Sequence, residues 1–281
     1  MLVTGAGGFI GQYLCRRLRN LDATVVAVDC YTPDSSEALS GFTQVDLASS
    51  DEIRALDRVD PTLVFHLAAV GASDPFLPVE EALRVNVLGT VNLMQVLDGR
   101  APVMVARTAA EHNPSSPYAA SKAAAWGFCR MYARTNGWPL LGAMIFQCYG
   151  PGQSAQNVLP AALAAVRSGN EFPLSPGEQL RDWVSVEDVV SGLLAVARSE
   201  LAPGESIEIG TGKGTSLRET VQMLFKFAGG DGSPRFGALP YRPGEDMRAV
   251  ADADRTERMT GWRARTALAE GLRVLVSAGV S

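Results

Sequence analysis

Short apolar runs alternate with longer helical segments through the first half of the chain. The apolar runs have the continuity expected of strands that are covered on both faces. They lie at Leu2–Thr4, Thr24–Val28, Phe42–Leu47, Thr62–Ala69, Pro102–Ala106 and Leu140–Phe146. The helices predicted between them span residues 9–20, 79–97 and 121–134, and Gly137 is expected to end the last one. Strands that alternate with helices predict an α/β fold with a right-handed, doubly wound parallel sheet.

The pattern becomes less regular from Tyr149-Gly-Pro-Gly152 onward, where glycine and proline are frequent. Helices are expected at 159–168, 186–197, 217–228 and 267–276, with a short strand at 207–209. We therefore predict a sheet domain over residues 1–150 and a smaller, mixed lobe over residues 151–281 that holds the substrate. Some segments of this lobe are expected to return to the sheet domain.

A glycine-rich turn follows the first predicted strand. Gly5 and Gly8 stand between this strand and a helix that is predicted to start near Phe9, and Gly11 follows in the first turn of that helix. Small residues at such a turn let backbone N–H groups approach a pyrophosphate, and the helix dipole favours its charge. The second strand ends at Asp29, where an acid accepts hydrogen bonds from the ribose of NAD. The sequence thus predicts a Rossmann-like, dinucleotide-binding sheet. NAD is favoured over NADP, since the carboxylate would repel the extra phosphate.

The candidate chemistry lies in the segment Tyr118-Ala-Ala-Ser-Lys122. Residues four apart lie one turn from each other on the same face of a helix. An ammonium near a phenol stabilises the phenolate, so Lys122 is expected to lower the pKa of Tyr118 from about 10. Tyr118 would then serve as a general acid/base near neutral pH. His66, within an apolar strand, is interpreted as a packed, hydrogen-bonded histidine and not as a catalyst.

Composition narrows the choice of partners. The net charge of −5 and the lack of a long basic run argue against nucleic acid. No apolar run is long enough to cross a bilayer and no signal peptide precedes the first motif, so we expect no membrane partner. The four cysteines form no CxxC pair, which argues against a zinc site or a disulfide framework and favours the reducing cytosol. The expected location is therefore cytoplasmic.

Together these residues resemble the extended short-chain dehydrogenase/reductase family of nucleotide-sugar epimerases, dehydratases and ketoreductases. The matches occur in the family's order and span nearly the whole chain. They are Thr4-Gly-Ala-Gly-Gly-Phe-Ile-Gly11, Val45-Asp-Leu47, His66-Leu-Ala-Ala69, Val85-Asn-Val-Leu-Gly-Thr90, Tyr118-Ala-Ala-Ser-Lys122, Tyr149-Gly-Pro-Gly-Gln153, Arg181-Asp-Trp-Val-Ser-Val-Glu-Asp188, Ile209-Gly-Thr-Gly212 and Arg242-Pro-Gly-Glu245.

The resemblance implies a role for each matching position. Tyr118 would be the acid/base, Thr108 would hydrogen-bond the reacting sugar oxygen, and Lys122 would hold the nicotinamide ribose. The implied cofactor-binding residues are Gly5, Gly8, Phe9, Ile10, Gly11, Asp29, Cys30, Asp46, Leu47, Leu67, Ala68, Ala69, Asn86, Tyr118 and Lys122. The implied binding residues for a nucleotide-diphosphate sugar are Thr108, Gln147, Asn157, Arg181 and Arg242, the two arginines clamping the diphosphate.

Departures from the family pattern bear on the reaction. Arg107 stands where a serine is usual and has no explanation in the sequence. Ala109 and Ala110 stand where a related 4,6-dehydratase carries Asp-Glu, so the dehydratase is set aside. A C4 epimerase is favoured, with an NAD(P)H-dependent 4-ketoreductase and a non-catalytic, cofactor-binding regulator as alternatives. The family often dimerises through the helices that follow the fourth and fifth strands, so a homodimer is expected.

Overall fold

The computed structural model describes residues 1–31, 41–74 and 76–279. Within this part of the chain the backbone forms two compact units. The first consists of Met1–Met144 and Val190–Ile207, and the second of Ile145–Val189 and Glu208–Ser281. The segment that returns to the first unit is thus 190–207, and the expected boundary at residue 150 lies inside the second unit.

The first unit contains a seven-stranded sheet in the order β10-β6-β5-β4-β1-β2-β3. Register is parallel for β1 with β2 and β4, for β2 with β3, and for β4 with β5. This confirms the predicted doubly wound α/β architecture. The strands are β1 (Leu2–Thr4), β2 (Val26–Asp29), β3 (Phe42–Gln44), β4 (Val64–His66), β5 (Val103–Thr108), β6 (Leu140–Ile145) and β10 (Ser206–Ile209).

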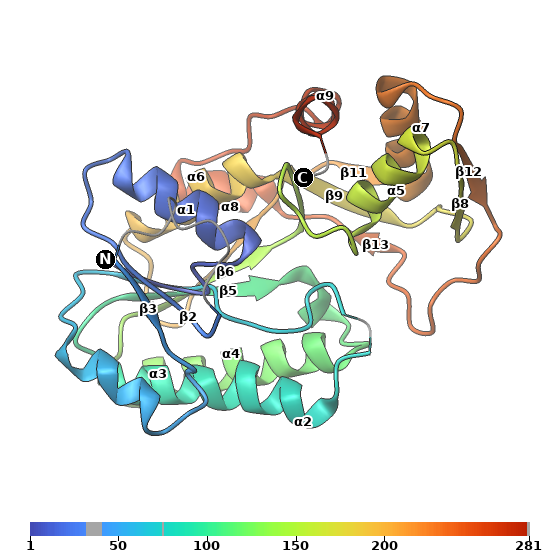
Figure 1. Ribbon diagram of the computed structural model, residues 1–281. Coiled ribbons are helices and arrows are strands. Elements are labelled where there is room, and N and C mark those ends of the chain that lie inside the picture. The colour runs from blue at the N-terminus through green and yellow to red at the C-terminus, as the bar shows by residue number, and fades with distance from the viewer. Residues whose placement is uncertain (32–40, 75, 280–281) are drawn as a thin grey trace. The chain divides into compact units, whose positions relative to one another are not determined.

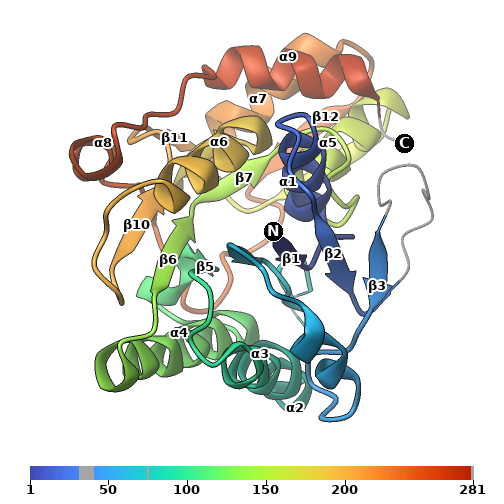
Figure 2. The same cartoon turned by 90° about the vertical axis from the view of Figure 1, so that its left-hand side faces the viewer.

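Helices cover both faces of this sheet. In Figures 1 and 2, α2, α3 and α4 lie side by side on one face and α1 lies on the other. The helical segments are α1 (Phe9–Arg19), η2 (Glu52–Arg58), α2 (Val79–Ala82), η3 (Leu83–Leu88), α3 (Gly89–Leu97), η4 (Ala109–His112), α4 (Pro117–Asn136) and α6 (Val186–Ala197). Gly137 ends α4, as predicted, and it has the left-handed conformation that favours glycine.

One apolar core fixes α3 and α4 on the sheet. Leu93 and Leu97 of α3 and Trp126 of α4 pack in the same cluster as Leu2 and Val64 from the central strands. Each of these residues is at most 4% exposed. Burying side chains of this size contributes about 1.5–3 kcal/mol each, so α3 and α4 are held firmly against the face of the sheet.

The expected helix 79–97 is interrupted. Leu83–Leu88 forms a π-helical segment, η3, between α2 and α3. Such segments are uncommon and occur often at functional sites, because they re-aim side chains within a helix. The buried Asn86 belongs to this segment.

The second unit combines small sheets with helices around its own core. In one sheet β9 lies between β11 and β13 and also pairs with β7, while β12 pairs with β8. Tyr149, Trp183 and Leu224 lie in its core. The elements are β7 (Gln147–Tyr149), α5 (Val158–Arg167), β8 (Glu171–Leu174), β9 (Leu180–Ser185), β11 (Gly214–Ser216), α7 (Leu217–Ala228), β12 (Ser233–Phe236), β13 (Arg248–Ala249), α8 (Ala253–Thr260) and α9 (Leu268–Ala278). Among the described residues, none of the helices is both long and apolar enough to span a membrane.

Candidate active site and cofactor pocket

The glycine-rich turn brings β1 and α1 close to β4. Gly5 has a φ of +71°, and a Cβ there would lie 2.6 Å from the backbone N of Ala68. A Cβ on Gly11 would lie 2.1 Å from the carbonyl oxygen of Gly5. Only glycine fits at these positions: Gly5 lies in the turn before α1, and Gly11 lies in the first turn of α1, which begins at Phe9. The turn therefore has the close packing that a phosphate-binding strand-turn-helix needs.

Gly5→Ala and Gly137→Ala should separate backbone strain from a steric clash. Both glycines have nearly the same φ, +71° and +69°, but nothing lies within 4 Å of a Cβ at Gly137. Gly137→Ala should cost about 1–2 kcal/mol of unfolding free energy. Gly5→Ala should cost about 1–3 kcal/mol more, since β1 and β4 must move apart. Urea unfolding measures the unfolding free energy of both variants. Equal losses of this free energy would contradict the clash at Gly5.

A cavity of about 300 Å³ opens at the carboxyl ends of β1, β2 and β4. Its volume is at the lower end of ligand pockets. Asp29 is fixed at its wall by backbone N–H groups: Oδ2 accepts from Gly7 at 2.9 Å and Oδ1 from Cys30 at 2.8 Å. The predicted residues among its lining are Gly5, Gly8, Asp29, Cys30, Asp46, Leu47, Leu67, Ala68 and Ala69. The cavity therefore fits the adenosine side of a dinucleotide, with Asp29 available to ribose hydroxyls.

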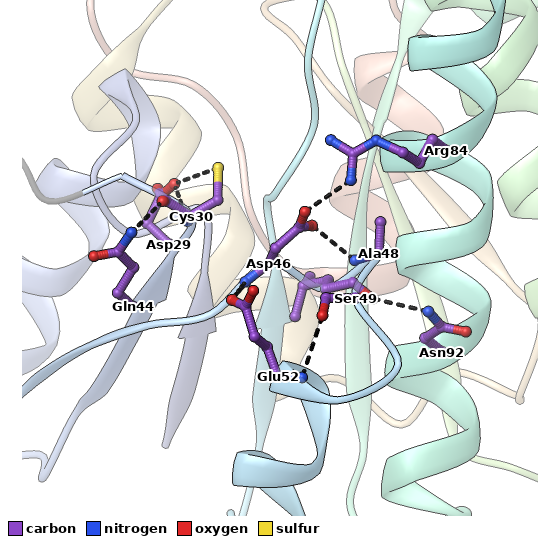
Figure 3. Close-up of polar contacts among 10 residues, drawn as sticks. Asp29, Cys30, Gln44, Asp46, Ala48, Ser49, Glu52, Arg84 and Asn92 are labelled. Carbon is purple, nitrogen blue, oxygen red and sulfur yellow. Dashed lines mark hydrogen bonds and ion pairs between the residues drawn. The ribbon is translucent and has the colours of Figure 1, made fainter.

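Asp46 is held in place by Arg84, a residue that sequence analysis did not select. Figure 3 shows the guanidinium reaching from its helix to this carboxylate, with a distance of 2.7 Å between Nη1 and Oδ2. The N–H of Ala48 donates to Oδ1 at 2.9 Å. Burial alone would raise the pKa of Asp46, but these hydrogen bonds bring it below its ordinary value. Asp46 is thus an anion with a fixed orientation at the cavity wall.

Other predicted cofactor residues stand outside the cavity lining. Phe9, Ile10 and Gly11 form the first turn of α1. Asn86 is buried, and its amide bonds the backbone N and O of Val70 at 2.8 and 3.1 Å. It also donates to Ser121 Oγ at 2.9 Å. Asn86 therefore ties a cavity-lining loop to α4, and direct contact with the cofactor stays a prediction.

His66 is confirmed as a packed, hydrogen-bonded histidine. Its Nε2 lies 2.8 Å from Thr90 Oγ1, which itself donates to the carbonyl of Asn86 at 2.7 Å. Thr90 must therefore accept from Nε2–H, so Nδ1 accepts from Thr4 Oγ1 at 2.8 Å. Burial and the charge of Lys122 lower the pKa of His66 to about 3. The ring is neutral at physiological pH.

Thr108, Tyr118 and Lys122 lie where β5 ends and α4 begins. Thr108 is the last residue of β5, and its side chain acts to lower the pKa of Tyr118, so the two side chains lie near each other. Pro117 occupies the first position of α4 after its N-cap Ser116, so Tyr118 lies in the first turn. Lys122 follows one turn later and is 4% exposed. The three predicted catalytic residues therefore belong to neighbouring ends of two elements of one unit.

The expected lowering of the Tyr118 pKa is wrong for this structure. Burial raises the pKa of Tyr118 to about 12, and the carboxylate of Glu111 adds to the rise. Only the side chain of Thr108 acts in the opposite direction. The pKa of Lys122 is lowered by burial, while Glu111 opposes that change. Burial of the phenol thus decides the direction of the shift, and the helical spacing of Tyr118 and Lys122 does not reveal it.

Apart from Thr108, the predicted substrate residues belong to the second unit. Gln147 starts β7, and Asn157 is the N-cap residue of α5. Arg181 of β9 forms an ion pair with Glu245 and donates to the carbonyl of Asp246 at 2.7 Å. Arg242 is exposed. A diphosphate clamp by the two arginines stays a prediction.

Residues 1–210 match the model of the NAD dependent epimerase/dehydratase family. The chain belongs to this family. It is 30% identical to a dTDP-glucose 4,6-dehydratase of Streptomyces griseus, over 99% of this chain and 93% of the relative. It is also 30% identical to a UDP-glucose 4-epimerase of Mycolicibacterium smegmatis, over 96% of this chain and 95% of the relative.

Solved structures agree with this assignment. MoeE5 in complex with UDP-glucuronic acid and NAD is 31% identical, with a TM-score of 0.88 over 98% of this chain and 97% of that chain. The UDP-glucose 4-epimerase of Thermus thermophilus in complex with NAD is 29% identical, with a TM-score of 0.84 over 99% of this chain and 97% of that chain. The predictions of an extended short-chain dehydrogenase/reductase and of NAD as its cofactor are confirmed.

In this member of the epimerase/dehydratase family, Arg107 now has an explanation. Its Nε and Nη2 donate to Glu111 Oε2 at 2.9 and 2.7 Å. Sequence analysis did not select Glu111. The available signal was the spacing of four residues between opposite charges, but its meaning depended on where β5 ends and a short helix begins.

Proposed function

We propose that the chain is an NAD-dependent nucleotide-sugar epimerase that inverts C4 of the sugar. The observation that carries this proposal is the placement of Thr108 at the end of β5, and of Tyr118 and Lys122 one turn apart at the start of α4, in the unit that also contains the cavity beside the glycine-rich turn. Relatives of similar identity include both an epimerase and a dehydratase. The choice between these reactions therefore depends on the residues around Thr108.

Each of the three residues has one task in the proposed reaction. Tyr118 takes the proton of the sugar 4-hydroxyl and later returns it. Thr108 hydrogen-bonds the same oxygen. Lys122 binds the nicotinamide ribose and balances the charge of the phenolate. NAD supplies the hydride acceptor, and the positive charge of its oxidised ring opposes the effect of burial on the Tyr118 pKa.

The residues after Thr108 favour epimerisation over dehydration. A dehydratase needs acid/base groups beyond the tyrosine to eliminate water, and Ala109 and Ala110 have none. The next acid, Glu111, has a side chain that is 1% exposed and is bound to Arg107. Asp29 disfavours the extra phosphate of NADP and with it the ketoreductase alternative.

Product analysis with UDP-glucose, UDP-glucuronic acid and dTDP-glucose tests the proposal. We expect protein as purified to retain NAD and to convert at least one of these sugars to its C4 epimer without net change in NADH. In deuterium oxide, the carbon-bound hydrogens of the product should stay unexchanged, because the same hydride returns. A 4-keto-6-deoxy product would indicate a dehydratase. One-way consumption of NAD(P)H with a keto sugar would indicate a ketoreductase.

We also propose a homodimer through the outer faces of α2, η3 and α4. Large apolar side chains that are 41–57% exposed are present there: Val79, Leu83, Leu88, Phe128 and Met131. Light scattering should give twice the mass of 29.8 kDa for the parent. Met131→Glu should shift the protein toward the monomer, because the charge would be desolvated at an interface. Val274→Glu, at a similarly exposed position of α9, should not.

A further inference from the structure

A buried ion pair adjoins the predicted catalytic residues. The side chains of Arg107 and Glu111 are 14% and 1% exposed, and two hydrogen bonds join them. The guanidinium also donates from Nη1 to Ser206 Oγ at 2.9 Å and lies 4.8 Å from the ring centroid of Trp126. Contacts among β5, η4 and α4 thus hold both charged groups in one arrangement.

The second carboxylate oxygen of Glu111 reaches the backbone of the reacting centre. Oε1 accepts from the N–H of Thr108 at 2.9 Å, as part of a capping box at the start of η4. The side chain of Thr108 in turn acts on the phenol of Tyr118, whose pKa it lowers. Thr108 therefore links Glu111 to the phenol. The position of Glu111 fixes the end of β5, where Thr108 lies.

The charge of Glu111 changes the pKa of both Tyr118 and Lys122. After burial, which is the larger influence on each, the carboxylate raises the pKa of both groups. It thus favours the neutral phenol and the charged ammonium. The other charged or titratable groups that influence or face this pair are Arg107 from β5, Cys129 from α4 and the neutral His66 from β4.

Stability alone does not require such a pair. Taking two charges out of water is costly, and apolar residues of similar volume often replace a buried ion pair without loss of stability. We infer that Glu111, held by Arg107, is a positioning residue for the reaction: it fixes the backbone at Thr108 and supplies the negative charge that Tyr118 and Lys122 face. This inference rests on the proposed function, since it assigns Tyr118 the acid/base role.

Two variants remove the charge and keep the acceptor for Thr108. Glu111→Gln retains a side-chain carbonyl oxygen, and Arg107→Met with Glu111→Gln also removes the cation that would otherwise be unpaired. The readout is carbon NMR of protein labelled at tyrosine Cζ, with the Tyr118 signal assigned by its loss in Tyr118→Phe. In both variants the titration midpoint of Tyr118 should fall by about one pH unit. The limb of the kcat–pH profile that follows this phenol should move to lower pH with it.

Glu219→Gln provides the matched control. Glu219 is the corresponding carboxylate of the capping box at Ser216 of α7, and its replacement should leave the Tyr118 titration unchanged. An unchanged midpoint in the two Glu111 variants would overturn the inference, and so would failure of both to fold, since the pair would then be structural. A shifted midpoint in protein that turns over no nucleotide sugar would support the inference on charge and overturn the proposed function alone.

Discussion

Tyr118→Phe should lower kcat by about 10²–10⁴-fold, the usual contribution of a positioned general acid/base. The ring would keep its place in the first turn of α4, so NAD should remain bound. Steady-state rates with the substrate identified by product analysis, together with the NAD content of the purified variant, measure both effects.

Tyr132→Phe is the control for loss of a phenol from the same helix. The ring of Tyr132 stacks on Trp138 with centroids 4.5 Å apart, and its hydroxyl meets Gln95 Nε2 at 3.4 Å. This weak contact lies outside the predicted site, so kcat should stay within about twofold of the parent. If Tyr118→Phe has the kcat of the parent, Tyr118 is not the acid/base of the reaction.

The features that sequence analysis located well depend on local spacing. The glycine-rich turn, Asp29 and the left-handed Gly137 follow from residues that are close along the chain. The bounds of α6 and α7 agree with the predicted ranges, because caps and apolar periodicity coincide there. The helix α8 was not predicted: its segment has few apolar residues, and only Asp252 and Gly261 mark its ends.

The features that sequence analysis missed depend on burial and on contacts between elements. The spacing of Tyr118 and Lys122 is visible in the sequence, but the desolvation that raises the Tyr118 pKa is not. Arg107 and Glu111 could be found as opposite charges four residues apart, yet their burial comes from packing under α4. The π-helical segment η3 leaves no signal in apolar periodicity, and it places Asn86 where it ties the loop after β4 to α4.

Asp182 is a buried carboxylate that we expect to hold the second unit together. It is 0% exposed and lies in β9. Its Oδ1 accepts from the N–H and the hydroxyl of Thr211 at 2.8 and 2.6 Å. Its Oδ2 accepts from the N–H groups of Gly212 and Ala251 at 2.8 and 3.2 Å. One side chain therefore satisfies the backbone of two loops that flank β9.

Asp182→Ala should destabilise the second unit by more than about 3 kcal/mol, since each buried donor left without an acceptor costs about 1–3 kcal/mol. Thr211→Val removes only the hydroxyl and leaves three N–H groups bound to the carboxylate, so it should cost about 1 kcal/mol. Urea unfolding followed by tryptophan fluorescence measures both, because Trp183 lies in the core of this unit. Equal losses in the two variants would show that the backbone N–H groups do not depend on Asp182. If Asp182→Ala loses at least three times as much unfolding free energy as Thr211→Val, the carboxylate is established as the anchor of both loops.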